Sequence, residues 1–246
     1  MILRAGPSVR VLVTGFGPFP GVLHNASASM VSSLAQSAKI PGIELFTEVI
    51  PVKWADAGTA AREAIARVEP HAVLHFGVSK RATGFEIETR AFNASGPKQD
   101  HAGVVRPSRP LDRSGMRVLF ATMPPAILLR ALRRGGFPAQ LSRNAGRYLC
   151  NAVFYWSLSD AGSSGRLVSF IHIPALAPDA KAGQRFSLKD AIAGAHVLIR
   201  ASAQAVLLAR QKAQLSWPHF MRTWRKNGTA SKLIGWPGQT RPCPGV

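Results

Sequence analysis

The chain has 246 residues, 46% of them hydrophobic, which suits one α/β domain with a substantial core. Its two cysteines exclude a disulfide framework, and no uninterrupted apolar run approaches the roughly 20 residues that a transmembrane helix needs. The N-terminus carries no apolar signal-peptide core. We therefore expect a cytoplasmic protein without a membrane partner.

The charge is strongly basic, with 31 Lys and Arg against 12 Asp and Glu, a formal net charge of +19. Such a surplus concerns solubility and association rather than fold. No acidic residue follows Asp190, whereas Trp217, Trp224 and Trp236 do. This segment is either a basic aromatic surface for nucleic acid or anionic lipid, or a poorly ordered tail.

Strand-like and helix-like segments alternate along most of the chain. Short β-branched or apolar runs predict strands at 9–14, 43–50, 71–76, 85–92, 118–121 and 167–173. Helical composition with capping residues and Pro or Gly stops predicts helices at 25–38, 55–68, 125–134, 148–159 and 187–211. This order predicts a single α/β domain, 1–213, with a mostly parallel twisted sheet and helices on both faces. Residues 214–246 form a basic Trp- and Pro-containing C-terminal extension.

A glycine-rich loop, Gly15–Gly21, follows the first strand. It does not fit a dinucleotide-binding loop, because its third glycine is one position late and Pro18 and Pro20 lack the N–H groups that cradle phosphate. A stiff loop with Phe16 and Phe19 suits a small flat ring. The alternative is a structural turn with both phenyl rings in the core.

Two segments carry candidates for nucleophilic catalysis. Gly146 breaks the chain before a helical run, so Cys150 falls in or near the first turn of a helix, where the partial positive charge favours a thiolate. His172 lies one residue before the end of an apolar strand, and ligands of open α/β sheets bind at such ends. The alternatives are a small buried cysteine and a core histidine bonded to a backbone carbonyl. The histidines show no spacing typical of a metal site, so we predict no metal.

Glu86 and Glu88 stand two residues apart and share one face of their predicted strand. Spacing does not choose between them. Taken alone, they also fit a solvated strand face.

The four segments occur together in one order, and the combination resembles the pyroglutamyl-peptidase (pyrrolidone-carboxylate peptidase) family of cysteine peptidases. The family motif T-G-F-x-P-F is matched by T-G-F-G-P-F at 14–19, and E-R-x-A-x-N is similar to E-T-R-A-F-N at 88–93. The motif A-G-x-x-x-C-N is present as A-G-R-Y-L-C-N at 145–151, and F-I-H-x-P as F-I-H-I-P at 170–174. The resemblance covers about residues 9 to 213.

The resemblance implies hydrolysis of the bond that follows an N-terminal pyroglutamyl residue. It implies Cys150 as the nucleophile, His172 as the base and Glu88, rather than Glu86, as the residue that orients the histidine. It also implies no cofactor, small pyroglutamyl peptides as partners, no specific nucleic acid, and a homo-oligomer, which in similar enzymes is a tetramer. The substrate-binding positions that it implies are Phe16, Phe19, Asn25, Gly77, Val78 and Lys98.

The chain departs from the family around the pocket rather than in the triad. Gly77-Val78, followed by Ser-Lys-Arg, stands where relatives have Gly-Gln. Lys98 replaces an arginine, whose fork of donors a lysine cannot copy. Two alternatives therefore stay open beside the peptidase: a non-catalytic relative that binds acidic partners through its basic surface, and a Cys–His enzyme acting on another small cyclic amide.

Overall fold

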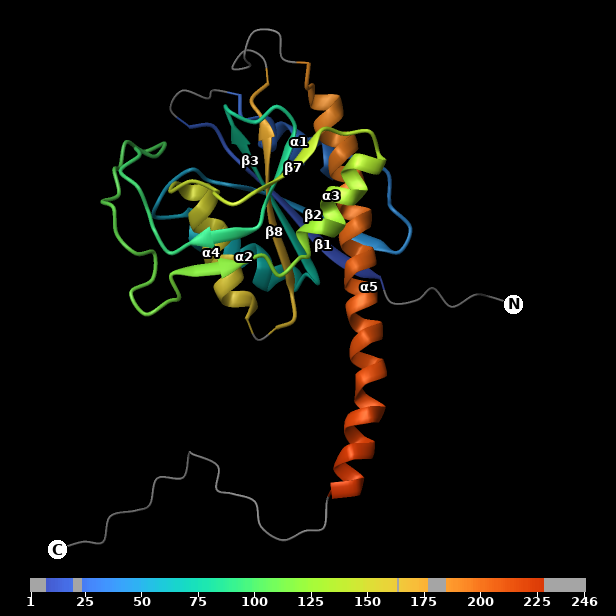
Figure 1. Cartoon of the computed structure of the whole chain (residues 1–246). Helices are drawn as coiled ribbons and strands as arrows, with labels where there is room; N and C mark the ends of the chain where they lie inside the picture. The colour runs from blue at the N-terminus through green and yellow to red at the C-terminus, as the bar shows by residue number, and fades with distance from the viewer. Residues whose placement is uncertain (1–7, 20–23, 163, 177–184, 228–246) are drawn as a thin grey trace, which may run out of the picture. The chain divides into compact units, whose positions relative to one another are not determined.

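The computed structural model describes residues 8–19, 24–162, 164–176 and 185–227, with side chains described through Gln214 (Figure 1). The chain divides into two units, residues 1–208 and 209–246, and the fold described below is that of the first.

A six-stranded sheet forms the centre of this unit, in the order β2-β1-β3-β8-β4-β7. The strands β1, β2, β3 and β8 are mutually parallel, β4 runs antiparallel to β8, and β7 is parallel to β4. The predicted mostly parallel sheet is therefore confirmed. The bounds are β1 Val9–Phe16, β2 Ile43–Ile50, β3 Ala72–Ser79, β4 Phe85–Glu88, β7 Ala139–Ser142 and β8 Leu167–Pro174.

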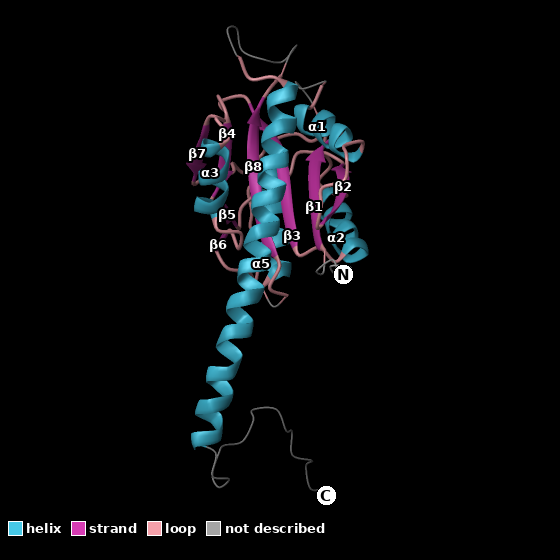
Figure 2. Cartoon of the chain, turned by 90° about the vertical axis from the view of Figure 1, so that its right-hand side faces the viewer, coloured by secondary structure: helices cyan, strands magenta, loops and turns pink. Residues whose placement is uncertain are grey.

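Helices cover both faces of the sheet because its central strands are apolar on both sides. Val11 and Val13 of β1 belong to the core cluster that holds residues of α1, α3 and α5, whereas Leu12 belongs to the cluster with α2 and α4. Figure 2 looks onto the face with α1, α3 and α5. The bounds are α1 Ala26–Ala35, α2 Ala57–Val68, α3 Pro125–Arg134, α4 Leu149–Ala161 and α5 Leu188–Asn227.

The segment 85–92, predicted as one strand, forms two. After β4 the chain breaks at Thr89, whose N–H and hydroxyl both donate to the carbonyl of Ser142, at 2.8 and 2.9 Å. The following strand β5, Arg90–Phe92, then pairs with β6, Val118–Phe120, in a separate two-stranded sheet. The strand β7 was not predicted, because its sequence Ala-Gln-Leu-Ser has no β-branched or aromatic residue.

The helix α5 ends at Asn227 rather than at the predicted Gln211. Pro218 lies inside it; the fixed φ of proline is compatible with a helix, at the cost of a hydrogen bond. Residues 228–246, with Trp236 and Cys243, lie outside the described residues. The division into a domain 1–213 and an extension 214–246 stays a prediction.

One helix among the described residues, Leu188–Gln214, is long and apolar enough to cross a membrane by length and composition. In its most apolar window, 56% of the residues are buried inside the protein. A core helix of a soluble protein passes the same test, so this finding is weak evidence for a membrane span.

Candidate active site

A cavity of about 320 Å³ lies where the carboxyl ends of β1, β3 and β8 meet the start of α4. Ligands of open α/β sheets bind at this edge. Of the predicted site residues, all but Gly77 and Glu88 line the cavity. Its lining residues are Phe16, Phe19, Asn25, Val52, Val78, Ser79, Arg81, Glu86, Lys98, Asn144, Ala145, Gly146, Tyr148, Leu149, Cys150 and His172.

Cys150 is the second residue of α4, as the sequence predicted. The chain enters the helix through Gly146, whose φ of +81° is one that residues with side chains rarely adopt. The N–H of Gly146 donates to Asn144 Oδ1 at 3.1 Å and fixes this turn. The first N–H groups of a helix have no intrahelical acceptor, and the backbone N–H of Cys150, at the second position of α4, is one of these groups.

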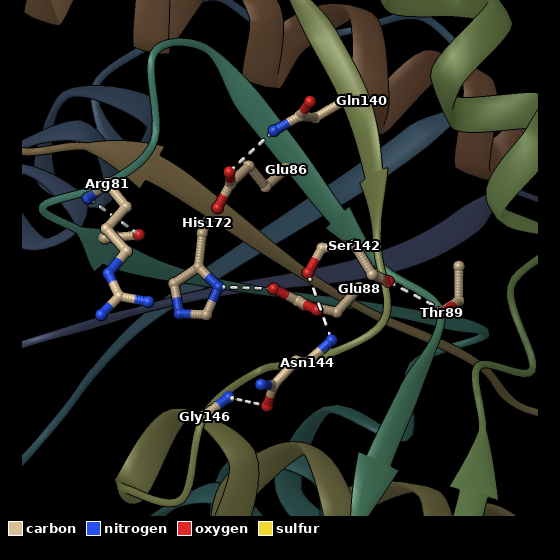
Figure 3. Close-up of polar contacts among 10 residues, drawn as sticks. Arg81, Glu86, Glu88, Thr89, Gln140, Ser142, Asn144, Gly146 and His172 are labelled. Atoms are coloured by element: carbon tan, nitrogen blue, oxygen red, sulfur yellow. Dashed lines mark hydrogen bonds and ion pairs between the residues drawn. The ribbon is translucent and has the colours of Figure 1, made fainter.

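His172 and Glu88 are joined directly. His172 Nδ1 donates to Glu88 Oε1 at 2.8 Å, from β8 to the adjacent strand β4 (Figure 3). Glu88 is 1% exposed and His172 7%, so the solvated strand face that Glu88 also fitted is wrong. Because Nδ1 is engaged by the carboxylate, Nε2 is the ring nitrogen left for proton transfer.

Cys150 and His172 line the same cavity, and their side chains interact. Burial lowers the pKa of His172, but the interaction with Cys150, the hydrogen bond to Glu88 and the negative charges of these two groups outweigh burial and raise the pKa to about 10. The imidazolium is therefore the favoured form in the folded protein at neutral pH. A protonated imidazole in this position can deliver its proton to a leaving group.

Glu86 lies beside this pair without joining it. In the register of β4 and β8, Glu86 is opposite His172 and Glu88 is opposite Phe170. The Glu86 carboxylate accepts from Gln140 Nε2 at 2.9 Å (Figure 3). Ligand atoms of Glu86, Glu88 and His172 lie within 4.8 Å of one another, a grouping that could hold a metal ion. Since Nδ1 of His172 is already bonded to Glu88, we keep the absence of a metal as a prediction.

The Phe16 loop is held by two polar side chains of α1 and its cap. Asn25, the N-cap, donates from Nδ2 to the carbonyl of Gly17 at 2.8 Å and accepts from Ser27. The Ser27 hydroxyl in turn accepts from the N–H of Phe16 at 2.9 Å. Phe16 is 3% exposed, so it is at once a core residue and part of the cavity wall. Asn25 thus lines the cavity while holding the loop.

Lys98 and Phe19 form the outer part of the wall. The ammonium of Lys98 lies 4.9 Å from the Phe19 ring centre and 4.6 Å from that of Tyr148, both cation–π distances. The next turn is fixed by Asp100, which accepts from the N–H groups of Trp54, Ala102 and Val104.

Val78 lines the cavity with an apolar side chain, whereas Gly77 lies behind it. A Cβ on residue 77 would stand 3.0 Å from Cys150 Sγ and 2.9 Å from Phe170 Cζ. Gly77 therefore lets β3 approach the nucleophile closely, and the structure gives it a packing position rather than a place in the wall.

Two residues at or beside the cavity, Arg81 and Asn151, were not predicted from the sequence. Arg81 belongs to the basic stretch after Val78 and lines the cavity together with His172. Asn151, within the matched Cys-Asn motif, is fully buried; it accepts from the N–H of Phe92 and donates to the carbonyls of Phe92 and Ala94, at 2.8 to 3.0 Å. It joins α4 to β5, next to the nucleophile. The motif was the signal for Asn151, but nothing in the sequence shows where Arg81 points.

The sequence matches the pyroglutamyl peptidase family model over residues 9–205. It is 31% identical over 169 residues to a pyrrolidone-carboxylate peptidase of Pyrococcus furiosus, covering 68% of this chain and 81% of that protein. A pyrrolidone-carboxylate peptidase of Mycobacterium bovis is 30% identical over 220 residues, covering 85% of this chain and 96% of that one.

Solved structures agree with the sequence comparison. A mutant pyrrolidone carboxyl peptidase from Pyrococcus furiosus superposes with a TM-score of 0.75 at 26% identity, over 80% of this chain and 99% of that one. The enzyme from Thermococcus litoralis has a TM-score of 0.76 over 82% of this chain and 96% of that one; at 22% identity it supports the fold alone. The chain belongs to the pyroglutamyl peptidase family of cysteine peptidases.

Proposed function

We propose that this protein is a cysteine-type omega-peptidase that hydrolyses the peptide bond after an N-terminal pyroglutamyl residue, with Cys150, His172 and Glu88 as its catalytic residues. The observation that carries the proposal is the hydrogen bond from His172 to the buried Glu88 carboxylate, with Cys150 in the same cavity as His172 at the start of α4. These side chains come from α4, β8 and β4, and only the fold brings them together.

The chemistry follows from this geometry. The Cys150 thiolate attacks the carbonyl carbon of the scissile bond, and the oxyanion that forms is stabilised by the Cys150 N–H and the dipole of α4. The His172 imidazolium then gives its proton to the leaving amine, which departs and leaves a thioester on Sγ. Water, deprotonated by His172, hydrolyses the thioester and releases pyroglutamate. Glu88 holds the imidazole orientation and stabilises its charge in both steps.

The aromatic side of the cavity suits the lactam ring. Phe16 and Phe19 offer flat apolar surfaces, and Val78 adds another apolar contact. Lys98 sits over the rings of Phe19 and Tyr148, where its charge faces the cavity. In our proposal Phe16, Phe19, Val78 and Lys98 contact the ring or its carbonyl, while Asn25 and Gly77 position the Phe16 loop and the nucleophile.

The two alternatives differ in their support. The non-catalytic relative is not favoured, because all three proposed catalytic residues are present and His172 is hydrogen-bonded to Glu88 beside Cys150. Action on another cyclic amide depends on which ring the cavity binds, and Val78 offers the ring no hydrogen-bonding group. We also propose that the enzyme acts in the cytosol, where reducing conditions keep Cys150 in its reduced state. The homo-oligomer expected from the family stays a prediction.

Turnover of pyroglutamyl-aminocoumarin under reducing conditions tests the proposal, with prolyl-aminocoumarin as the comparison. We expect release of aminocoumarin from the pyroglutamyl substrate alone. Release from neither substrate would contradict a peptidase, and a preference for the prolyl substrate would show that the pocket selects a different ring.

A further inference from the structure

A second cavity, of about 1020 Å³, adjoins the active site and is strongly basic. It lies between β5, the loop from Asn93 to Val118, and the segment that leads to α4. Five arginines line it: Arg90, Arg113, Arg117, Arg143 and Arg147. Among the described lining residues the single acid is Asp112, and its Oδ1 already accepts from the N–H and hydroxyl of Ser114 at 2.9 Å each.

These arginines have no carboxylate partner in the part of the chain that the structure describes. The arginines that do form ion pairs there, Arg10, Arg62 and Arg67, lie elsewhere and meet Glu69, Asp160 and Glu48. Unpaired arginines are expected in a chain of net charge +19, but their convergence on one concave surface is not. A concave surface that carries charges of one sign concentrates the electrostatic field. It therefore attracts anions and is stabilised most when an anion binds in it.

The basic cavity and the catalytic cavity share a residue. Asn144 lines both, Arg143 and Arg147 face the basic cavity, and Ala145 and Gly146 face the catalytic one. This short segment runs directly to Cys150. The two cavities are therefore neighbours across the loop that carries the nucleophile.

The basic cavity lies where we expect the leaving part of the substrate, which is the peptide after the scissile bond. In the proposed function the lactam ring lies against Phe16 and Phe19, so the chain beyond the scissile bond must leave Cys150 on another side. Asn144 marks the side that leads to the arginines. An extended peptide advances about 3.3 Å per residue, so a few residues suffice to reach a neighbouring cavity.

We propose that the five-arginine cavity binds acidic side chains downstream of the pyroglutamyl residue, so that the enzyme prefers pyroglutamyl peptides rich in Asp and Glu. This inference rests on the proposed function and names its substrate class. Guanidinium groups pair with carboxylates through two parallel hydrogen bonds, which gives affinity and selects for charge. A single-stranded nucleic acid is the competing occupant, and the test separates the two.

The test compares three substrates: pyroglutamyl-aminocoumarin, a pyroglutamyl peptide with three alanines, and one with three glutamates, both peptides amidated. At low salt we expect kcat/KM for the acidic peptide to exceed that for the alanine peptide about tenfold or more, mainly through KM. The double variant Arg113→Gln/Arg143→Gln should remove most of that ratio. Arg134→Gln, an exposed arginine on α3 that lines neither cavity, is the matched control and should preserve it.

Equal kcat/KM for the two peptides would overturn the proposal, as would an equal loss in Arg134→Gln, which would reveal a general charge effect. Binding of the same peptides to the Cys150→Ala protein gives the preference even if no substrate turns over, so a failed peptidase and a failed acidic site are distinguished. A different result is a protein that shows no preference for the acidic peptide and binds an oligothymidine through the cavity arginines, without competition from that peptide. This result would assign the surface to nucleic acid.

Discussion

Glu88 bonds His172 diagonally across the antiparallel pair β4–β8, at 2.8 Å, although Glu86 is the residue directly opposite the histidine. The diagonal contact is possible because residues two apart on a strand share a face. Glu86 is instead occupied by Gln140. Two neighbouring carboxylates thus have different partners, and this difference supports our proposal that Glu88 orients the histidine.

The first prediction uses this pair. Glu88→Gln should lower kcat by about 10²–10⁴-fold with little change in KM, because the amide cannot stabilise the imidazolium. Glu86→Gln, the matched control, should stay within about threefold of the parent. Steady-state kinetics on pyroglutamyl-aminocoumarin measure both. Equal losses in the two variants would show that position 88 has no special role.

Gly77→Ala tests the packing beneath the nucleophile. The new Cβ would stand 3.0 Å from Cys150 Sγ and 2.9 Å from Phe170 Cζ, so the thiol must shift. We expect kcat to fall about 10–100-fold and the free energy of unfolding to fall by about 1–3 kcal/mol. Gly17→Ala is the control, since its Cβ would meet only the Ile50 carbonyl, at 3.9 Å. Kinetics and urea unfolding of both variants check this, and a fully active Gly77→Ala would contradict the tight approach.

Asn151→Ala tests the link between α4 and β5. The substitution leaves the Phe92 N–H and the carbonyls of Phe92 and Ala94 without their partner in a buried site. We expect a loss of about 2–4 kcal/mol in the free energy of unfolding. Gln36→Ala, at the exposed end of α1, should change it by less than about 0.5 kcal/mol. Similar values for the two variants in urea unfolding would sink the idea.

Two buried histidines should make stability depend on pH in opposite directions. The pKa of His172 is raised to about 10, so its stabilising contribution is complete below about pH 6.5 and is lost as pH rises through 10. Burial lowers the pKa of His75 to about 3. The unfolded chain therefore binds a proton that the folded one does not between about pH 6.5 and 3, and stability falls as pH drops through that range.

Urea unfolding from pH 4 to 10 measures this dependence. We expect a maximum near neutral pH, with the alkaline slope reduced in His172→Gln and the acid slope retained there. His75 is fully buried, which keeps it neutral, and it is hydrogen-bonded to Thr14 Oγ1 at 2.7 Å and Ser157 Oγ at 2.9 Å. An alkaline slope that is unchanged in His172→Gln would contradict the assignment.

Local sequence signals predicted most of the fold. Asn25 as a helix cap and Pro125 at the start of a helix define their elements without any distant contact. The break after Glu88 was not predicted, because it depends on Thr89 bonding Ser142, a residue far along the chain. The full length of α5 was not predicted, because the residues after about 215 do not continue the alternating pattern of strands and helices.

The residues of the candidate site also differ in how far the sequence predicted them. Cys150 and His172 were candidates from position alone, at a helix start and at a strand end, whereas the choice of Glu88 required the family motif. Contacts across the sheet then separate Glu88 from Glu86. The five-arginine cavity joins β5, a long loop and the segment before α4, and sequence composition shows its charge but not its convergence.

The most direct test of the central claim is kcat/KM for pyroglutamyl-aminocoumarin with the parent protein and with Cys150→Ala, under reducing conditions. The account predicts turnover by the parent and a loss of several orders of magnitude in kcat/KM in the variant. Circular dichroism of the variant should match that of the parent, which shows that the loss is not due to unfolding. Turnover by Cys150→Ala at the parent's rate, or a folded parent protein that does not cleave the substrate, would contradict it.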